Sequence, residues 1–505
     1  MADTVHAMRT VSAITKKELY RRNTPMDQFS APLAEALLKH SREDVVPFDV
    51  PGHKHNLDVL KEYFGEQCVA LDLNSRKSID YLCEAKGVIK QAEQLAADAF
   101  GAADAFFMVG GTTSSVQAMI MSACAPGDKI LIPRNVHYSV INAVILAGAT
   151  PVYINPSVHP TLGIALGMRV DDVVKSIVEN KYATAIFLNN PTYYGICSDI
   201  ESIVKIAHQH NVRVLVDEAH GTHFYFNDKL PTAAMHCGAD MAAVSMHKTG
   251  GSLTQSSILL SSGSIPPTHI NNVINLTRTT SASYLLLASL DLARRLLATQ
   301  GQELLDAVIS HTNKARDQIN QIGTYWAFGK DIVDGDSVYD FDLTKLSIYT
   351  LGTGLAGIEL YSSLRDGYGI QIEFGDMNNI LAVATHGNSE SHYDRLVSAL
   401  LEISQTTNTP CKRDFIYEYI APRVLITPRE AFYAKKEYIP LADSRNRISA
   451  KSVMYYPPGI PILAPGELIT DEIISHVLYA VEKGCTVTGL GADNRIAVVE
   501  VNGEK

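Results

Sequence analysis

The chain is 505 residues long, and 46% of its residues are hydrophobic. A chain of this length exceeds the size at which a single hydrophobic core usually stops growing, so we expect one large domain and at least one smaller one. Acidic residues outnumber basic residues by 54 to 43, and the formal net charge of -11 opposes any general attraction to nucleic acid or to anionic lipid.

The N-terminal region carries no recognisable export signal. Residues 1–22 mix charges of both signs with polar residues and lack the apolar stretch of a secretory signal. No segment approaches the roughly 18 consecutive apolar residues that span a membrane. The 7 cysteines are scattered without a C-x-x-C pair, which is typical of reduced thiols. These features predict a soluble cytoplasmic protein with no membrane partner.

From about residue 87 to residue 262, short apolar runs alternate with amphipathic stretches, which is the pattern of a parallel sheet covered by helices. The predicted strands are residues 105–109, 129–132, 152–154, 183–188, 213–216, 241–244 and 257–260. Helices between them are predicted at 113–124, 169–180 and 199–211. Seven strands with helical crossovers predict an open α/β sheet.

The second half of the chain predicts smaller units. Residues 281–321 carry apolar side chains at helical spacing and contain Gly301, which predicts two long helices leading out of the large domain. After residue 330, a smaller α+β domain is predicted. Its apolar segments are residues 345–349, 357–360, 370–374 and 381–384, followed by a helix near 390–404. The passage YYPPGIPILAPGE at 455–467 is too rich in proline for a regular central element.

Residues that directly follow the strands of an open α/β sheet face the crevice where ligands bind. After the first predicted strand, the run GGTTSS at 110–115 leads into a helix and offers backbone N–H groups, hydroxyls and a helix N-terminus to a phosphate. Serine and threonine are also ordinary helix N-caps. This run alone therefore leaves both interpretations open.

A carboxylate follows the fifth predicted strand. In RVLVDEAHGTH, Asp217 comes directly after an aliphatic run, where it can pair with a pyridinium nitrogen and keep it protonated. The letters DEAH also occur in helicases, but the chain has no G-x-x-x-x-G-K-[ST] phosphate loop. His220 and His223 could suggest a metal site, yet the H-E-x-x-H arrangement is absent and no third ligand stands out. We therefore expect no metal.

A lysine follows the sixth predicted strand. Lys248 ends the segment ADMAAVSMHK and is followed at once by Thr249 and two glycines. A lysine at the end of a buried strand is costly to leave charged and unpaired, so its pKa should fall, which favours Schiff-base chemistry. Its position one strand after Asp217 argues against an isolated lysine with no function.

These residues resemble the fold-type-I enzymes that use pyridoxal 5'-phosphate (PLP), and more narrowly the Orn/Lys/Arg decarboxylase family. Matching segments run through nearly the whole chain in order: PFDVPGHKHN at 47–56, GGTTSSVQAMI at 110–120, PRNVHYSV at 133–140, NNPTYYG at 189–195, DEAHGTH at 217–223, SMHKTGGSLTQSS at 245–257, TPREAFYA at 427–434 and YYPPGIPILAPGE at 455–467. The chain looks most like the short bacterial arginine decarboxylases, which lack the N-terminal wing domain of longer relatives.

The resemblance implies a fold and an assembly. The fold is an α/β, PLP-dependent transferase-like large domain with a mostly parallel seven-stranded sheet, and a smaller α+β C-terminal region. The expected division is an N-terminal segment at 1–86 that contributes to the active site and the dimer, a PLP-binding domain at 87–325, a small domain at 326–410 and a C-terminal decarboxylase-family domain at 411–505. A homodimer or an assembly of dimers is implied.

The resemblance also assigns catalytic roles to matching positions. Lys248 would hold PLP as a Schiff base, and Asp217 would bind the pyridine nitrogen. His137, in RNVHYSV, would stack on the ring. His220 would lie near the cofactor as a proton donor or as a neighbour of the substrate carboxylate. Tyr138 departs from the lysine or arginine expected after the stacking histidine, which puts the contacts around His137 in doubt.

The phosphate of PLP would be bound by Thr113 and Ser114 after the first strand, and by Ser245 and His247 beside the lysine. Met246 stands where a small residue often precedes the His-Lys pair, so contacts next to the phosphate are in doubt.

Three further features keep two interpretations each. Residues 52–55, GHKH, are either a polar loop or, as the resemblance implies, lie near the active-site entrance or the neighbouring subunit. Glu467 is either an acid at a helix start or the group that reads the distal cation of the substrate. Asp342 and Lys345, in DLTKL, are as consistent with a structural pair as with a catalytic one.

The implied reaction is decarboxylation of a small cationic L-amino acid. Arginine would give agmatine, a precursor in polyamine biosynthesis, whereas lysine and ornithine would give cadaverine and putrescine. An aminotransferase or a β-eliminating lyase would share Asp217 and Lys248. A catalytically silent PLP-binding regulator fits less well, because His137 is retained with both residues.

Overall fold

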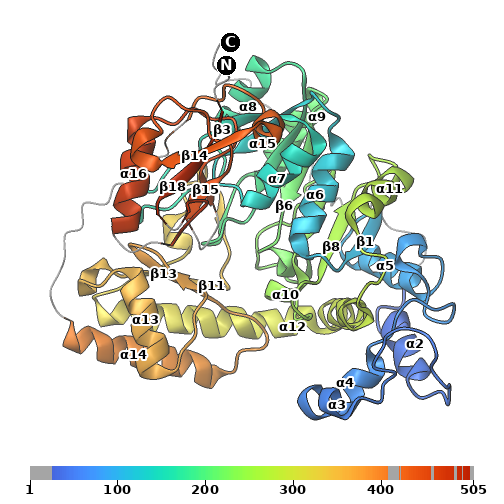
Figure 1. Cartoon of the computed structure of the whole chain (residues 1–505). Helices are drawn as coiled ribbons and strands as arrows, with labels where there is room; N and C mark the ends of the chain where they lie inside the picture. Colours follow the sequence, from blue (N-terminus) through green and yellow to red (C-terminus); the bar gives the residue numbers. More distant parts are fainter. Residues whose placement is uncertain are drawn as a thin grey trace, which may run out of the picture.

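The structure, a computed structural model, describes residues 26–407, 420, 422–455, 460–482, 486–491 and 493–500. Figure 1 shows a large α/β part in blue to green, a smaller part in yellow and orange, and a C-terminal part in red. The predicted boundary near residue 410 and residues 456–459 of the proline-rich passage lie outside the described residues.

A seven-stranded sheet forms the middle of the large part, in the order β1-β8-β7-β6-β4-β2-β3. Strand β8 runs antiparallel to both of its neighbours, and the other neighbouring pairs are parallel. The strands are β1 (Asp104–Met108), β2 (Lys129–Pro133), β3 (Thr150–Ile154), β4 (Ala183–Asn189), β6 (Arg213–Asp217), β7 (Met241–Val244) and β8 (Ser257–Ser261). The predicted mostly parallel sheet is therefore confirmed.

Helices cover both faces of this sheet, because its strands carry apolar side chains on both sides. Within β6, Leu215 packs into the core on one face and Val214 and Val216 into the core on the other. The first face is covered by α6 (Gly111–Ala123), α7 (Tyr138–Ala147) and α11 (Pro267–Thr277). The second face is covered by α5 (Val88–Ala99), α8 (Val170–Glu179), α9 (Ile200–Gln209) and part of α12 (Tyr284–Ile322).

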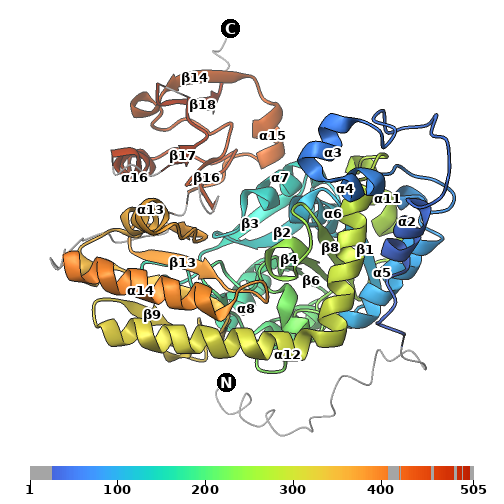
Figure 2. The same ribbon diagram turned by 90° about the horizontal axis from the view of Figure 1, so that it is seen from below.

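The prediction of two helices at 281–321 is wrong, because the chain forms one helix of 39 residues, α12. Gly301 is buried within it and does not end it. A side chain there would bring a Cβ atom within 2.8 Å of the Cβ atom of Phe226, so the glycine allows close packing. Figure 2 shows α12 running from the large part to the small domain.

The small domain is a four-stranded antiparallel sheet in the order β12-β13-β11-β9, with helices packed against it. Its elements are β9 (Trp326–Phe328), β11 (Lys345–Tyr349), α13 (Gly357–Tyr368), β12 (Phe374–Gly375), β13 (Asn379–Val383) and α14 (Glu390–Thr406). The expected apolar segment at 357–360 is the start of a helix, since the Glu359 carboxylate accepts a hydrogen bond from the Ala356 N–H and caps it.

Within the described residues after 420, the C-terminal part forms two small sheets and two α-helices. Its elements are α15 (Pro428–Tyr433), β14 (Lys436–Pro440), β15 (Val453–Tyr455), β16 (Ile460–Leu463), α16 (Asp471–Glu482), β17 (Val487–Thr488) and β18 (Arg495–Val499). Pro461 lies in β16, which is the edge strand of the β16-β15-β17 sheet. An edge strand tolerates proline, and this agrees with the expectation that no regular central element forms here.

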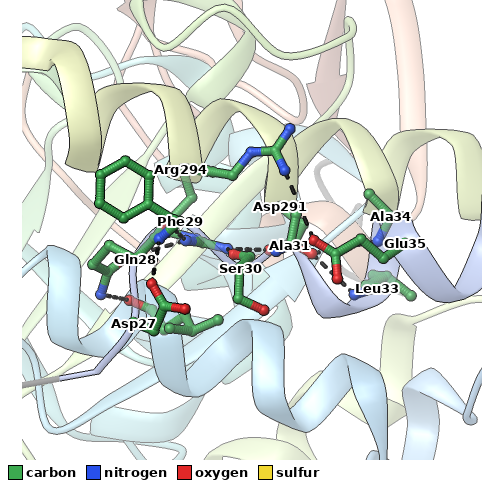
Figure 3. Close-up of polar contacts among 12 residues, drawn as sticks. Asp27, Gln28, Phe29, Ser30, Ala31, Leu33, Ala34, Glu35, Asp291 and Arg294 are labelled. Atoms are coloured by element: carbon green, nitrogen blue, oxygen red, sulfur yellow. Dashed lines mark hydrogen bonds and ion pairs between the residues drawn. The ribbon is translucent and has the colours of Figure 1, made fainter.

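The N-terminal segment packs against α12 through a buried network, which Figure 3 shows. Its helices are α2 (Pro32–His40), α3 (Asp58–Phe64) and α4 (Glu66–Leu71). The Asp291 carboxylate accepts hydrogen bonds from the backbone N–H groups of Leu33 and Ala34, in the first turn of α2. Arg294 pairs with Asp291 at 2.5 Å and donates to the carbonyl oxygens of Gln28 and Ser30.

Short elements complete the chain between these units. They are η2 (Leu82–Glu84), β5 (Ile196–Cys197), η3 (Thr222–Phe226), α10 (Met246–Thr249), η4 (Lys330–Ile332), β10 (Asp340–Phe341), η5 (Leu351–Thr353) and η6 (Leu441–Asp443). Among the helices that the structure describes, none is both long enough and apolar enough to cross a membrane.

Candidate active site

The predicted catalytic residues lie where parallel strands of the large sheet end. Asp217 is the last residue of β6, Lys248 follows β7, and His137 follows β2. The carboxyl ends of parallel strands meet at one edge of the sheet, and ligands of open α/β folds bind there. The topology therefore brings together residues that are far apart in the sequence.

Lys248 contacts a histidine from the neighbouring strand end. Its Nζ atom lies 2.8 Å from Nε2 of His220. The ring of Tyr193, from the loop after β4, lies 5.5 Å from this Nζ atom and packs on His220 with 4.3 Å between ring centroids. Three strand ends thus surround one amine.

The electrostatic environment of Lys248 favours the neutral amine. Burial lowers the pKa of Lys248, and the carboxylates of Asp217 and Glu373 oppose this effect without cancelling it. Burial, followed by the ammonium group of Lys248, holds the pKa of His220 well below its usual value. The pair therefore joins a lysine of lowered pKa to a neutral imidazole, which suits a nucleophile.

Asp217 and His137 lie at the ends of strands in the same sheet as Lys248. Asp217 is 7% exposed and accepts a hydrogen bond from the Ala219 N–H. Burial raises the pKa of Asp217, and the charge of Lys248 opposes that rise. His137 is the N-cap of α7, its ring bonded to Ser139, and burial lowers its pKa to about 4.

The predicted phosphate residues lie around the start of α6 and beside Lys248. Thr113 and Ser114 are in the first turn of α6, which begins at Gly111 with a positive φ of 72°. A Cβ atom at Gly110 would lie 2.8 Å from the hydroxyl oxygen of Ser114, so this glycine keeps the loop close to the helix start. The arrangement is a glycine-lined cradle at a helix N-terminus.

Ser245 and His247 lie beside the segment that leads into β8, and this segment also contacts the start of α6. The Ser245 hydroxyl is 3.3 Å from Nδ1 of His247, and that nitrogen is 3.0 Å from the carbonyl oxygen of Ser256. Because a carbonyl oxygen only accepts hydrogen bonds, Nδ1 of His247 carries the proton and donates this hydrogen bond to Ser256. The hydroxyl of Ser257 contacts that of Ser115 at 2.8 Å and ties the start of β8 to α6.

Sequence reasoning gave no role to Tyr193 or Glu373, although both reach this site. The exposed Glu373, just before β12, accepts a hydrogen bond of 3.0 Å from the Tyr193 hydroxyl. Tyr193 lies in the NNPTYYG segment that matched the family, whereas Glu373 belongs to no noted motif. Only the packing of the small domain against the large one brings Glu373 here.

Asp342 and Lys345 form a fully buried ion pair at 3.4 Å, which favours the structural interpretation. The other carboxylate oxygen lies 3.1 Å from Nε2 of His223 and accepts from the Thr344 hydroxyl. Burial alone would raise the pKa of Asp342, but His223 and Lys345 hold it well below its usual range. Among the described residues, no group of three or more histidine, cysteine or acidic side chains could hold a metal ion.

The other open features have polar partners of their own. In the GHKH segment, His53 lies 3.1 Å from Asp72, and Nδ1 of His55 donates to the carbonyl oxygen of Val69. The prediction of Glu467 as a helix-start acid is wrong, because α16 begins at Asp471.

Both carboxylate oxygens of Glu467 are hydrogen-bonded to Arg134, at 2.6 and 2.9 Å. This fully buried pair joins the C-terminal part to the residue that follows β2. Glu467 is fully buried and already paired with Arg134, so the interpretation as the group that binds the substrate's distal cation also loses its support within this chain.

Comparisons with known proteins agree with this geometry. The model of the Orn/Lys/Arg decarboxylase major domain matches residues 31–392, and that of the family's C-terminal domain matches residues 413–493. The arginine decarboxylase of Bacillus subtilis is 43% identical over 92% of this chain and 96% of its own length. That of Bacillus anthracis is 41% identical over 92% of this chain and 96% of its own length.

Solved structures extend the comparison. The lysine decarboxylase of Francisella novicida superposes with a TM-score of 0.83 over 94% of this chain and 81% of its own, at 21% identity. This likeness shows that the chain has the fold of a PLP-dependent fold-type-I decarboxylase. With the matches of both family domains, the chain belongs to the Orn/Lys/Arg decarboxylase family.

Proposed function

We propose that this enzyme uses PLP to decarboxylate arginine, giving agmatine and carbon dioxide for polyamine biosynthesis in the cytoplasm. Relatives named arginine decarboxylase, at 41% to 43% identity over most of the chain, support the choice of arginine. The observation that carries the chemistry is the amine of Lys248, held 2.8 Å from a neutral His220 at the sheet edge that also carries Asp217.

The residues at this edge fit PLP. A buried carboxylate suits the pyridine nitrogen, a flat imidazole suits the ring face, and the glycine-lined start of α6 suits a phosphate. When bound, PLP supplies an electron sink that lets the carboxylate of the substrate leave as carbon dioxide. We therefore propose that Lys248 attaches PLP covalently, Asp217 binds the ring nitrogen and His137 stacks on the ring.

The phosphate would be held from two sides. Thr113 and Ser114 offer hydroxyls and backbone N–H groups at the start of α6, and Ser245 and His247 approach from the end of β7. This arrangement fixes one end of the ring system. Fixed geometry at the reacting carbon contributes to catalysis because it replaces a search for the productive orientation.

Decarboxylation consumes one proton for each molecule of substrate, because the carboxylate leaves as neutral carbon dioxide and Cα gains a hydrogen. His220 and Lys248 share a hydrogen bond next to the site where this proton is needed. We propose that Nε2 of His220 delivers it, directly or through Nζ of Lys248. Removal of the imidazole by His220→Ala should lower kcat by about 100-fold.

Glu373 is the proposed reader of the guanidinium group. Its carboxylate is exposed, bonded to Tyr193, and close enough to Lys248 to raise that lysine's pKa. A planar carboxylate can accept two parallel hydrogen bonds from a guanidinium. Glu373→Gln should therefore raise KM for arginine about ten-fold or more with a smaller change in kcat, which corresponds to roughly 1.5 to 3 kcal/mol for a hydrogen bond to a charged group.

We also propose a homodimer, in which residues 1–86 contribute to the interface and to the active site. The segment around α3 exposes many large apolar side chains, and Phe48 is 94% exposed. They are Val45, Val46, Phe48, Val50, Leu57, Val59, Tyr63 and Phe64. A patch of this kind marks an interaction surface. Light scattering that gives only a particle of the chain's mass, 55.1 kDa, would reject the dimer.

The decisive experiment offers arginine, lysine and ornithine separately to the PLP-loaded enzyme and measures carbon dioxide and the amine product. Agmatine from arginine, with at least ten-fold lower kcat/KM for the other two substrates, is expected. Cadaverine or putrescine as the main product would replace arginine with lysine or ornithine. Oxoacid product without carbon dioxide would indicate an aminotransferase.

A further inference from the structure

The site needs a supply of protons as well as a proton donor. If the proposed decarboxylation holds, each turnover removes one proton from the pair His220 and Lys248. His220 is 6% exposed, so it cannot exchange freely with solvent. Something in the protein must therefore reload it. This requirement rests on the proposed function, whereas the arrangement described next does not.

Three histidines near the site each carry a buried ring nitrogen without a hydrogen-bond partner among the described residues. The atoms are Nδ1 of His220, Nδ1 of His223 and Nδ1 of His386. Unpartnered buried polar atoms are rare in native proteins, and each one calls for an explanation such as an ordered water. Because three such histidine nitrogens lie around one site, we consider one function that involves all three.

The other ring nitrogen of each histidine has a defined neighbour. Nε2 of His220 contacts Lys248 at 2.8 Å. Nε2 of His223 contacts the buried carboxylate of Asp342 at 3.1 Å, which leaves Nδ1 as the nitrogen through which this ring can pass a proton. Nε2 of His386 approaches Gly251 so closely that a Cβ atom there would lie 2.6 Å from it.

The rings are also electrostatic neighbours. Burial is the largest cause that lowers the pKa of His220. The charges of Lys248 and Lys345 lower it further, followed by His223. Burial lowers the pKa of His386, and His223 lowers it further.

Nε2 of His223 also lies 3.0 Å from the Thr344 hydroxyl, and the carbonyl oxygen of Thr344 accepts from the Ala384 N–H, two residues before His386. His223, three residues after His220, therefore links the segment of His220 to the loop of His386. His386 is partly exposed in the loop after β13, so the series begins at solvent and ends at Lys248.

We propose that His386, His223 and His220 form a proton-supply route from solvent to the catalytic lysine, joined by ordered water between their Nδ1 atoms. His386 takes a proton from solvent and passes it to Nδ1 of His223. The resulting imidazolium is stabilised by the Asp342 carboxylate. As Nε2 of His220 releases its proton toward Cα, Nδ1 of His220 accepts the stored one. A water-mediated shift of that proton from Nδ1 to Nε2 then restores the donor, so one proton enters for each carbon dioxide released.

The first test replaces the middle of the route. His223→Gln keeps an N–H donor for Asp342 but has no second nitrogen, so the fold is expected to be retained. We expect kcat to fall by about 10- to 100-fold with KM unchanged, and the solvent deuterium isotope effect on kcat to rise, because proton supply becomes limiting. Wild-type kcat and an unchanged isotope effect in this variant would overturn the route.

The second test replaces the solvent end. His386→Ala should lower kcat by about ten-fold, and imidazole added to the buffer should restore it, because a small proton carrier can enter where the side chain was. The same imidazole should not rescue His223→Gln, whose defect is internal. His159→Gln is the matched control, since this partly buried histidine belongs to the loop after β3. Equal rescue of all variants, or of none, would contradict the proposal.

A third readout does not depend on turnover. A high-resolution crystal structure of the wild-type enzyme should show ordered water bonded to Nδ1 of His220 and to Nδ1 of His223. Dry, apolar surroundings at both atoms would overturn the route even in an active decarboxylase. Failure of the wild-type enzyme to release carbon dioxide from any amino acid would instead overturn the proposed function, and the route with it.

Discussion

Two buried lysines in this enzyme have opposite surroundings. Lys248, at the active site, faces the neutral ring of His220, and burial lowers its pKa. Lys345, at the junction with the small domain, lies 3.4 Å from Asp342, and the pKa of the Asp342 carboxyl is held well below its usual range. The first lysine lies beside a neutral imidazole, and the second lies in an ion pair with a carboxylate.

The same contrast separates the active site from the junctions between parts of the chain. Arg294 and Asp291 join the N-terminal segment to α12, and Arg134 and Glu467 join the C-terminal part to the large domain. Each of these buried pairs is bonded on both sides. Pairing therefore marks the places where parts of the chain are held together, and incomplete pairing marks the place where chemistry is possible.

The largest expected effect comes from removing the reactive lysine. Lys248→Ala should reduce kcat/KM for arginine by roughly 10⁴-fold or more, because the nucleophile and its share of proton transfer are both lost. The thermal midpoint of the enzyme without cofactor should not fall, since no bonded partner loses its charge. Visible absorbance after addition and removal of PLP should show no covalent retention. A variant that melts well below wild type would place Lys248 with the structural pairs.

Removing the paired lysine should do the reverse. Lys345→Met leaves the Asp342 carboxylate buried with one cation fewer, which should lower the free energy of unfolding by about 3 kcal/mol or more. The double variant Asp342→Asn with Lys345→Met removes both charges and should recover most of that loss. Urea unfolding followed by circular dichroism measures both values. No recovery in the double variant would mean that packing, and not pairing, dominates at this junction.

The sequence predicts the residues at the strand ends better than it predicts the contacts between domains. The seven strands were predictable because each apolar run is buried, and Asp217 and Lys248 followed from their places at strand ends. The contact of Glu373 with Tyr193 was not, since it depends on how two domains meet. The single helix α12 was not predicted, because glycine is unfavourable in a helix interior and suggests a break. Only the structure shows that Gly301 packs against the side chain of Phe226.

Glu93 is a third buried ionisable group, and the pH dependence of stability that it causes tests the comparison between paired and incompletely paired groups. Burial raises the pKa of Glu93 to about 7, against which Lys90 at 3.8 Å gives only partial compensation. The folded protein therefore holds this proton more tightly than the unfolded chain. The stabilising contribution is complete below about pH 4.5, decreases as pH rises toward 7 and is lost above it, a total of about 3 kcal/mol.

Glu93→Gln should abolish this pH dependence, because glutamine stays neutral and can still accept the hydrogen bond from the Phe107 N–H. The free energy of unfolding of the variant, relative to wild type, should increase by about 3 kcal/mol between pH 5 and pH 8. The exposed Glu179→Gln serves as the control and should show no comparable trend. A constant difference across this range would mean that Glu93 is ionised in the folded protein.

The smallest expected effect comes from Arg294→Lys. This variant separates the contribution of charge from that of hydrogen-bond geometry at the junction between the N-terminal segment and α12. Arg294 makes hydrogen bonds to Asp291, to the side chain and carbonyl oxygen of Gln28 and to the carbonyl oxygen of Ser30. Arg294→Lys keeps the positive charge beside Asp291 but cannot reach all of these acceptors, so the free energy of unfolding should fall by about 2 kcal/mol. Turnover per folded molecule should stay within about two-fold, because the lysine keeps the positive charge beside Asp291 and the lost hydrogen bonds act on stability. A loss of activity at full stability would show instead that the active site depends on the exact placement of the N-terminal segment by these hydrogen bonds, and not only on its attachment to α12.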